Sequence, residues 1–506
     1  MRSTFHTLET AKRSLFTQQA AINTVGNNIA NANTKGYSRQ VVNMVAARPI
    51  EAYGLMRSNT PGQLGTGVEF TSIERVRTTF LDDQFRNQNK YLGSWSVQSD
   101  TLDKLEAIVN EPGDTGIRKV IENFWNSWSD LSKDPDNVTG RKIVRENALA
   151  LVDTFNQTSR QLTDLSGDLT ENISVKATQM NTMIDTIASL NTEIRRIEGL
   201  GDQANDLRDQ RDLLTDQLSE IVNIQVVENE QGYNITMGGT ALVAGPTGTP
   251  VTADILTAAA ASGALTGGEV YGMIVSRDRY VKEYQQQLDS LANTLANGEL
   301  EVIVPAGSVL PGETAPLSEP RAVKVNGING LHRLGYTLES PATTGQDFFT
   351  FGAGAAGITA ASIQLNPAIA GDTNKIATSL RTETSGGTTT VVKGNNTLAL
   401  LMAELKDIKF TFDETAIGKG VSQSTVSDYY NSVVGALGVQ AQEASRQLQN
   451  TKSQLDQVDA GRQSVSGVSL DEEMSNLIKY QQAYNAAARL MSTFDEMLDK
   501  LINGTA

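Results

Sequence analysis

Apolar residues recur every seven positions at both ends of this 506-residue chain. Two rows follow this spacing, one near each end: Leu8, Leu15, Ile22 and Ile29, then Leu470, Leu477, Tyr484, Met491 and Leu498. A seven-residue repeat keeps one face of a helix against a partner helix. Because chain ends usually fray, this spacing predicts that the terminal helices pair with each other or with other subunits. Two unrelated surface helices are the alternative.

The first of these helices is followed by the segment NNIANANTKGYSRQ, residues 27–40. Asn31, Asn33 and Gly36 are residue types that accept left-handed backbone angles, and asparagine side chains bond to nearby backbone groups. They predict a sharp helix end, with an extended arm starting at Tyr37. From physical chemistry alone, this turn is an ordinary end of a helix.

Helical periodicity also fills much of the middle of the chain. Apolar spacing predicts long helices over four ranges: 117–131, 168–198, 270–297 and 434–458. Three aromatic residues, Phe124, Trp125 and Trp128, fall at helical spacing in the first range, which favours core packing over a binding platform. Long helices far apart in sequence suit an antiparallel bundle. Near the C-terminus, Ser469 before three acidic residues predicts the start of the last helix.

Two stretches have a different character. Residues 221–245 alternate β-branched residues between glycine-containing turn signals, which predicts a β-hairpin. Residues 299–397 hold 13 glycines and six of the twelve prolines, together with short strand-like runs such as RAVKVNGI. They predict a small, mostly β domain inserted between helices, and a low-complexity linker is the alternative.

Together these patterns predict a multi-domain α+β fold. Its main part is a long-helix coiled-coil bundle formed by the N- and C-terminal segments, with a β-hairpin and an inserted, mostly β domain. The chain exceeds the size of a single core, so about two to four domains are expected. We expect three parts: residues 1–45 with 466–506, residues 46–298 with 398–465 and the hairpin, and residues 299–397 as the outer domain.

The composition excludes several kinds of chemistry. The chain has no cysteine and only two histidines, so disulfides, thiolate nucleophiles and cysteine- or histidine-based zinc sites are not expected. The phosphate loop GxxxxGK[ST], the nucleophile elbow GxSxG and the zinc motif HExxH are missing. We therefore expect no enzyme activity, no cofactor and no metal.

The charge distribution argues against nucleic acid as a partner. The net charge is −16, but residues 1–50 carry six Lys and Arg against one Glu, so the remainder is strongly acidic. An acidic body lacks the cationic footprint that nucleic acid requires. No apolar run approaches the ~20 residues that span a bilayer, and the N-terminus lacks a cleavable secretory signal. These signals alone predict a cytosolic protein without membrane insertion.

Three segments resemble a known family. These are NNIANANTKGYSRQ (27–40), GTGVEFTSIERVRTTFLDDQFR (65–86) and VSLDEEMSNLIKYQQAYNAAARLMSTFDEMLDKLIN (468–503). They closely resemble the bacterial flagellar axial proteins, which form the rod, the hook and the junction between hook and filament. Within that family, Tyr37-Ser38-Arg39 is similar to the junction members, whereas rod and hook proteins typically carry phenylalanine at that point.

The resemblance implies a structural protein of the flagellum, an adaptor ring that joins hook to filament. It implies terminal helices that fold on assembly into the inner layer of a tubular polymer. It also implies export through the flagellar type III channel without a cleaved signal peptide. The implied partners are other copies of itself, the hook protein, a second junction protein, and a cytosolic export chaperone that holds the C-terminal helix.

The predicted assembly interface combines the two heptad rows with the turn. Residues of the first row would pack against the second row: Leu8, Leu15, Ile22 and Ile29 against Leu477, Tyr484, Met491 and Leu498. The turn residues Asn31, Asn33, Gly36 and Tyr37 would fix the angle between the inner helix and the outer body. Two alternatives stay open: a hook or rod protein of the same family, or an adhesive module within 299–397 carried on a structural scaffold.

Overall fold

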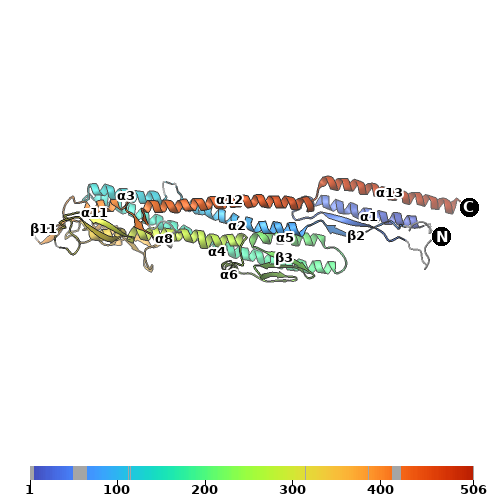
Figure 1. The fold of residues 1–506 in the computed structure, drawn as a ribbon, viewed down its shortest axis with the longest axis horizontal. Helices are drawn as coiled ribbons and strands as arrows, with labels where there is room; N and C mark the ends of the chain where they lie inside the picture. Colours follow the sequence, from blue (N-terminus) through green and yellow to red (C-terminus); the bar gives the residue numbers. More distant parts are fainter. Residues whose placement is uncertain are drawn as a thin grey trace. The chain divides into compact units, whose positions relative to one another are not determined.

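The computed structural model describes residues 5–49, 65–111, 113, 116–313, 315–385, 387–412 and 423–504. Within these ranges the chain is mostly helical, with small antiparallel sheets and a long C-terminal helix (Figure 1). The predicted combination of long helices and small sheets is therefore confirmed in this coarse form.

The chain divides into two compact units. Unit 1 holds Met1–Ser94, Ser174–Tyr271 and Gln449–Ala506, and unit 2 holds Trp95–Ile173 and Gly272–Leu448. Three long helices contribute residues to both units: α2 (Thr79–Val109), α4 (Val138–Glu198) and α12 (Val426–Ser466). Two of the four ranges with predicted helical spacing lie within these helices, 168–198 in α4 and 434–458 in α12. The division into three domains stays a prediction.

Unit 1 contains both ends of the chain. Its first elements are α1 (His6–Ala30) and an antiparallel ribbon of β1 (Gln40–Ala46) and β2 (Val68–Arg75). Further helices are α5 (Asn205–Ile221), α6 (Ala253–Ser262) and α13 (Leu470–Asn503), and the short helix α7 (Glu269–Val275) begins in unit 1 and ends in unit 2. α1 contacts both strands of the ribbon and lies along α13.

Unit 1 also holds one four-stranded sheet, in the order β3-β4-β5-β6. Its strands are β3 (Gln225–Asn229), β4 (Gly232–Met237), β5 (Thr240–Ala244) and β6 (Thr247–Gly248). The predicted hairpin over 221–245 is confirmed, and its two glycine-containing turns separate three successive strands. β6 was not predicted because a two-residue strand gives no alternation to detect.

Unit 2 combines helices with paired short strands. Its helices are α3 (Ile117–Lys133), a π-helical turn (Ser276–Val281), α8 (Lys282–Asn297), α9 (Gly327–Leu334), α10 (Pro367–Gly371), a 3-10 turn (Thr373–Lys375) and α11 (Thr397–Glu404). Its strands form two-stranded antiparallel sheets: β7 (Glu299–Val304) with β8 (Arg321–Asn326), β9 (Phe349–Phe351) with β10 (Ile363–Leu365), β11 (Thr382–Ser385) with β12 (Thr388–Val391), and β13 (Phe410–Thr411) with β14 (Gln423–Ser424). Residues 299–397 thus hold strand pairs interleaved with helices rather than one continuous sheet.

The core of unit 2 is aromatic. Phe124 and Trp128 of α3 are fully buried, and Trp125 is 2% exposed. The Phe124 ring centroid lies 6.1 Å from that of Phe348 and 6.0 Å from that of Phe349. Core packing was the favoured interpretation of this cluster, and the burial confirms it. The residues that α3 covers come from the DFFTF run, so the glycine-rich segment supplies part of this core.

Candidate assembly interface

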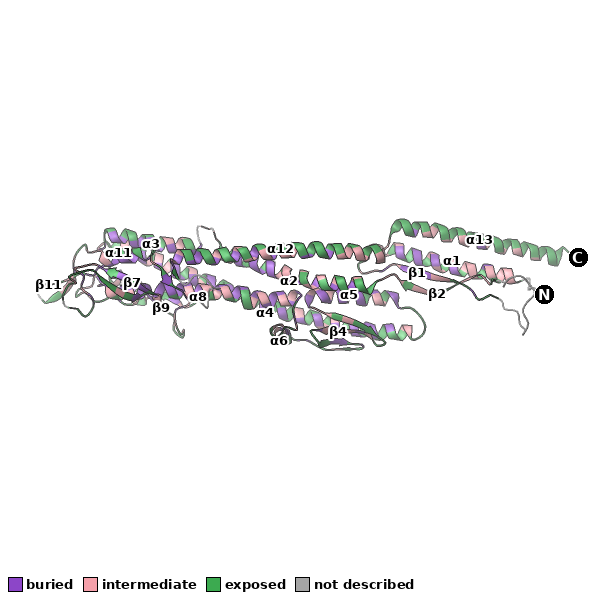
Figure 2. Cartoon of the chain, viewed as in Figure 1, coloured by how far each residue is buried: buried purple, intermediate pink, exposed green. Residues whose placement is uncertain are grey.

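The two terminal helices pack side by side within one chain. α13 begins as predicted, because the Ser469 hydroxyl accepts a hydrogen bond from the Glu472 N–H at 3.5 Å. Most of the less exposed residues of α13 form one stripe along the helix: Glu473, Leu477, Tyr480, Tyr484, Ala487, Met491, Phe494 and Leu498. Figure 2 shows this helix with its other faces exposed. The stripe includes four of the predicted row members, whereas Leu470 is 50% exposed.

α1 has two covered faces, and the heptad row marks only one of them. Leu8, Leu15, Ile22 and Ile29 are half-buried. The deepest residues of α1 are small or polar apart from Val25: Ala11, Thr17, Ala21, Thr24, Val25 and Asn28. α1 also packs on the β1–β2 ribbon, where the Thr17 hydroxyl donates to the Val68 carbonyl at 3.4 Å. The apolar spacing could not reveal this second face, because alanine and threonine carry little apolar signal.

The turn after α1 requires glycine at one position, Gly36. Gly36 has φ +85°, and a Cβ there would lie 3.0 Å from the Cβ of Leu213. Asn31 has φ −100° and instead donates from Nδ2 to the Asn27 carbonyl at 3.1 Å. Asn33 is exposed. The left-handed angle expected in this segment therefore falls at Gly36 and not at Asn31.

Tyr37 is half-buried where the arm leaves the turn. Its hydroxyl donates to Oδ1 of Asn28 at 2.9 Å and accepts from Nδ2 of Asn27 at 3.3 Å. Burial, followed by the nearby carboxylates of Asp206 and Asp209, raises the pKa of Tyr37 well above its ordinary value. The phenol is therefore neutral and available as a hydrogen-bond donor.

Asn28 is the residue that joins these elements, and the sequence reasoning missed it. Its Oδ1 accepts from Tyr37 and from the Gln40 N–H at 3.0 Å. Its Nδ2 donates to the Gln40 carbonyl at 2.8 Å and to Glu473 Oε2 at 3.0 Å. An asparagine amide has two donors and two acceptor sites, so these four bonds use the full hydrogen-bonding capacity of the Asn28 side chain. The available signal was a polar residue between Val25 and Ile29 on an apolar face.

The arm residues Ser38, Arg39 and Gln40 make polar contacts with α5, with the end of α12 and with the start of α13. The Ser38 N–H donates to Asp209 Oδ2 at 2.9 Å, and Gln40 Nε2 donates to Asp206 Oδ1 at 2.9 Å. The Arg39 N–H donates to the Ser466 carbonyl at the end of α12, at 2.9 Å. The Arg39 guanidinium also pairs with Glu472 in the first turn of α13, at 2.7 Å.

A buried cluster of four arginines and four aspartates lies next to the arm, in contact with Ser38. Its members are Arg75, Arg77, Arg86, Arg462, Asp82, Asp209, Asp212 and Asp216. Arg77 forms a two-bond fork with Asp82 at 2.7 and 3.0 Å. Arg462 of α12 reaches Asp216 of α5 at 2.6 Å. The charges balance one to one, so the cluster ties β2, α2, α5 and α12 together without net charge.

Asp212 is at the centre of this cluster. Its side chain is 1% exposed and lies 2.9 Å from Arg75 and 3.5 Å from Arg77. Burial alone would raise its pKa, but the arginines around it lower the pKa to about 2. The carboxylate is therefore charged at neutral pH.

A hollow of about 480 Å³ lies beside the turn, between residues 32–38 and the helices α2, α5 and α12. Its lining includes Phe85, Leu213 and Leu455 as well as Arg77 and Arg462. Within the described ranges, no group of His, Cys, Asp or Glu side chains is arranged to hold a metal ion. Among the same residues, no helix is long and apolar enough to cross a membrane.

Comparison with known families places these elements together in the class of flagellar axial proteins. Residues 8–37 match the family described as flagella basal body rod protein, and residues 459–504 match the flagellar basal body rod FlgEFG protein C-terminal. Residues 102–299 match the flagellar hook-associated protein FlgK helical domain. The first match lies on α1 and the turn after it, the second on the end of α12 and on α13, and the third on helices and the four-stranded sheet between them.

Whole-chain relatives define the family within that class. The chain is 35% identical to flagellar hook-associated protein 1 of Bacillus subtilis (strain 168), over 100% of this chain and 99% of the relative. It is 25% identical to the protein of the same name from Escherichia coli (strain K12), over 98% and 99%. The chain belongs to the flagellar hook-associated protein 1 family, whose place is the hook–filament junction of the bacterial flagellum.

One solved structure shares the fold. The flagellar hook junction protein FlgK from Burkholderia pseudomallei superposes with a TM-score of 0.50 at 14% identity. The similarity covers 75% of this chain and 100% of that one.

Proposed function

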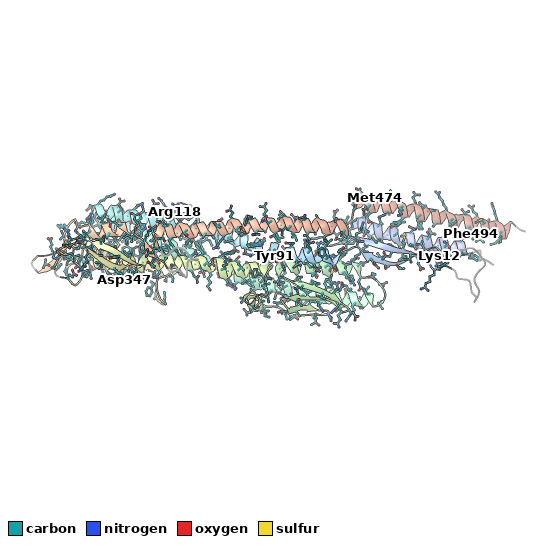
Figure 3. All side chains as sticks on the ribbon, in the orientation of Figure 1. Lys12, Tyr91, Arg118, Asp347, Met474 and Phe494 are labelled. Atoms are coloured by element: carbon teal, nitrogen blue, oxygen red, sulfur yellow. The ribbon has the colours of Figure 1, made fainter. Side chains whose placement is uncertain are left out.

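We propose that this chain forms an adaptor ring between hook and filament, assembled through coiled-coil packing of its terminal helices. The observation that carries this proposal is the apolar surface that one copy leaves exposed on α1 and α13. Exposed fractions reach 59% for Phe16, 48% for Met474, 55% for Ile478 and 52% for Met497. Met474 is labelled in Figure 3, as is the half-buried Phe494 of the α1-facing stripe. Clustered apolar surface of this kind marks an interaction site.

The interface residues of this proposal are those of the heptad rows and the turn. They are Leu8, Leu15, Ile22, Ile29, Asn31, Asn33, Gly36, Tyr37, Leu477, Tyr484, Met491 and Leu498. The paired rows would hold the two helices of each copy together, so that the remaining apolar faces meet neighbouring copies. The turn and its arm would hold this helix pair at a fixed angle to the rest of unit 1.

The proposed partners are further copies of the chain, the hook protein, a second junction protein, and a cytosolic export chaperone on the C-terminal helix. The name of the whole-chain relatives, flagellar hook-associated protein 1, supports the contact with the hook. The exposed apolar residues of α13 support a chaperone, because such a helix needs cover before assembly. The role is structural, without catalysis, nucleic acid or membrane insertion, and the chain reaches the outside of the cell without a cleaved signal peptide.

Deleting the gene should leave bare hooks and shed filament subunits into the medium. Without the adaptor, subunits that leave the hook have no surface on which to polymerise. Electron microscopy of the mutant cells, together with an assay of the medium for filament subunits, measures both effects. Complete filaments would reject the proposal, and missing hooks would place the protein in the rod or hook instead.

The Tyr484→Asp substitution should block incorporation into the flagellum. Tyr484 is half-buried in the stripe of α13 that faces α1, and a carboxylate there would have to be desolvated without a partner. We expect at least a tenfold loss of the protein from purified flagella, measured by immunoblot. The matched control is Gln482→Asp on the exposed side of the same helix turn. Normal incorporation of Tyr484→Asp would refute the interface.

A further inference from the structure

The heptad rows of α1 and α13 fit more than one alignment. The contact between Asn28 and Glu473 shows how the two helices are aligned, because it joins the end of α1 to the start of α13. Extending that contact antiparallel along both helices places Ile22 within one residue of Tyr480 and Leu15 within one residue of Ala487. In this alignment every apolar member of the α1 row meets a member of the α13 stripe.

A slip of one heptad preserves an apolar seam. Moving α13 by seven residues places Leu15 opposite Phe494, Ile22 opposite Ala487 and Ile29 opposite Tyr480. These pairs are as apolar as those of the observed alignment, because the α13 row continues to Leu498. The apolar pattern alone therefore does not select between the two alignments.

We propose that Asn28 and Glu473 are the residues that specify the register of the terminal helix pair. Asn28 is 1% exposed and Glu473 is 3% exposed, so each is buried and each satisfies the other. A single buried polar contact within an apolar heptad seam selects one register, because every other register leaves the polar groups unmatched. A buried carboxylate that loses its partner is penalised most strongly.

The opposite slip is excluded by the same pair. It would carry Glu473 along the seam to a position opposite Ile22, inside the apolar row. In the permitted register, Asn28 also binds Tyr37 and Gln40 of the arm, which joins the selected helix pair to the rest of unit 1. The pair therefore fixes the helices both relative to each other and relative to the arm.

The consequence for assembly rests on the proposed function. A slip of one heptad displaces α13 along α1 by about 10 Å at 1.5 Å per residue. In a ring built from these helices, that displacement would carry the exposed apolar residues of α13 away from the neighbouring copy. Correct register would thus be a condition for building the ring.

The experiment uses disulfide reporters, since the chain has no cysteine of its own. Leu15→Cys with Ala487→Cys reports the observed register, and Leu15→Cys with Phe494→Cys reports the slipped one. Each pair is oxidised mildly in the full-length chain, free and in purified flagella, and closure is read from gel mobility. With Asn28 and Glu473 intact, the first pair should close at least tenfold faster than the second.

Replacing Asn28 and Glu473 by apolar residues should allow the helix pair to adopt the slipped register as well. In the Asn28→Leu/Glu473→Leu background, closure of the slipped reporter should rise at least tenfold. The Asn28→Ala variant, which keeps the carboxylate, should lower closure of the observed-register reporter. The matched control is Asn23→Leu/Glu496→Leu, which makes the same changes at exposed positions of the two helices and should keep the original ratio.

An unchanged closure ratio in the double-leucine background would overturn the proposal. Equal closure of both reporters with the polar pair intact, or closure of neither, would overturn it as well. Absence of the otherwise unaltered chain from flagella would instead count against the proposed function, and the free chain would still report the register.

Discussion

The Asp212→Asn substitution is expected to lower the free energy of unfolding by about 3–5 kcal/mol, the cost of breaking a buried ion pair. The Asp212 side chain lies within 3.6 Å of three arginines, and it accepts a hydrogen bond from the Tyr233 hydroxyl. Asparagine keeps the shape but removes one negative charge. Because the cluster is balanced, the substitution would leave one buried arginine charge without a counter-charge.

Urea unfolding of the full chain measures this effect. The matched control is Asp202→Asn, the same chemical change at an exposed position shortly before α5, which should change the free energy of unfolding by less than about 0.5 kcal/mol. If Asp212→Asn cost less than about 1 kcal/mol, the cluster would not be a buried ionic network of the kind described.

The same substitution has a pH signature. The pKa of Asp212 is about 2 in the folded chain, against an ordinary value of 3.8. A carboxyl with a lowered folded pKa contributes stability above its unfolded pKa, and this contribution is lost as the pH falls through the folded value. Its size is on the order of 2 kcal/mol. The difference between the original chain and Asp212→Asn should therefore shrink as the pH falls from 5 towards 2.

The paired terminal helices were predictable because their signal is local. Rows such as Leu8–Ile29 need only a constant spacing within one segment, and Ser469 marks a helix start by its immediate neighbours. The glycine-containing turns of the β3–β5 sheet were predictable for the same reason. In each case the residues that carry the signal lie within a few turns or strands of each other in the sequence.

The charged cluster was not predictable, because its members are distant in sequence and of the types usually found at the surface. Asp82, Asp216 and Arg462 come from three separate helices, and nothing beside them marks them as buried. Asn28 was not predicted, although it lies within the segment 27–40 that carries the family resemblance. Its buried hydrogen bond is made to Glu473, which lies near the other end of the chain. The local sequence around either residue therefore does not predict the contact.

The glycine-rich segment, residues 299–397, shows a third limit of prediction from the sequence. Its short strand-like runs did form strands, but these strands pair into separate two-stranded sheets, and Phe348 and Phe349 of the same segment pack against Phe124 of α3. The local pattern therefore indicated strands without indicating their arrangement. Whether this segment is a separate outer domain stays a prediction.

The Gly93→Ala substitution should destabilise the chain by about 3 kcal/mol, since forced overpacking of a tight contact costs this much. Gly93 lies in α2 where that helix meets the end of α5 and the start of α7. A Cβ at this position would come within 3.0 Å of the Glu220 carbonyl oxygen and 3.1 Å from the Glu269 nitrogen. Both neighbours are backbone atoms, so a side chain cannot simply rotate away. The Gly268 N–H donates to the Lys90 carbonyl at 2.7 Å, which holds the two segments at this distance.

The matched control is Gly167→Ala in α4, and it should change stability in the opposite direction. Gly167 is exposed within a helix, and a Cβ there would meet nothing within 4 Å. Alanine at an open helical position is more favourable than glycine by about 1 kcal/mol. Chemical denaturation of the two variants separates helix propensity from packing, because propensity acts alike on both. If Gly93→Ala were also stabilising, α2 would not approach α5 as closely as described, and glycine at that position would need another explanation.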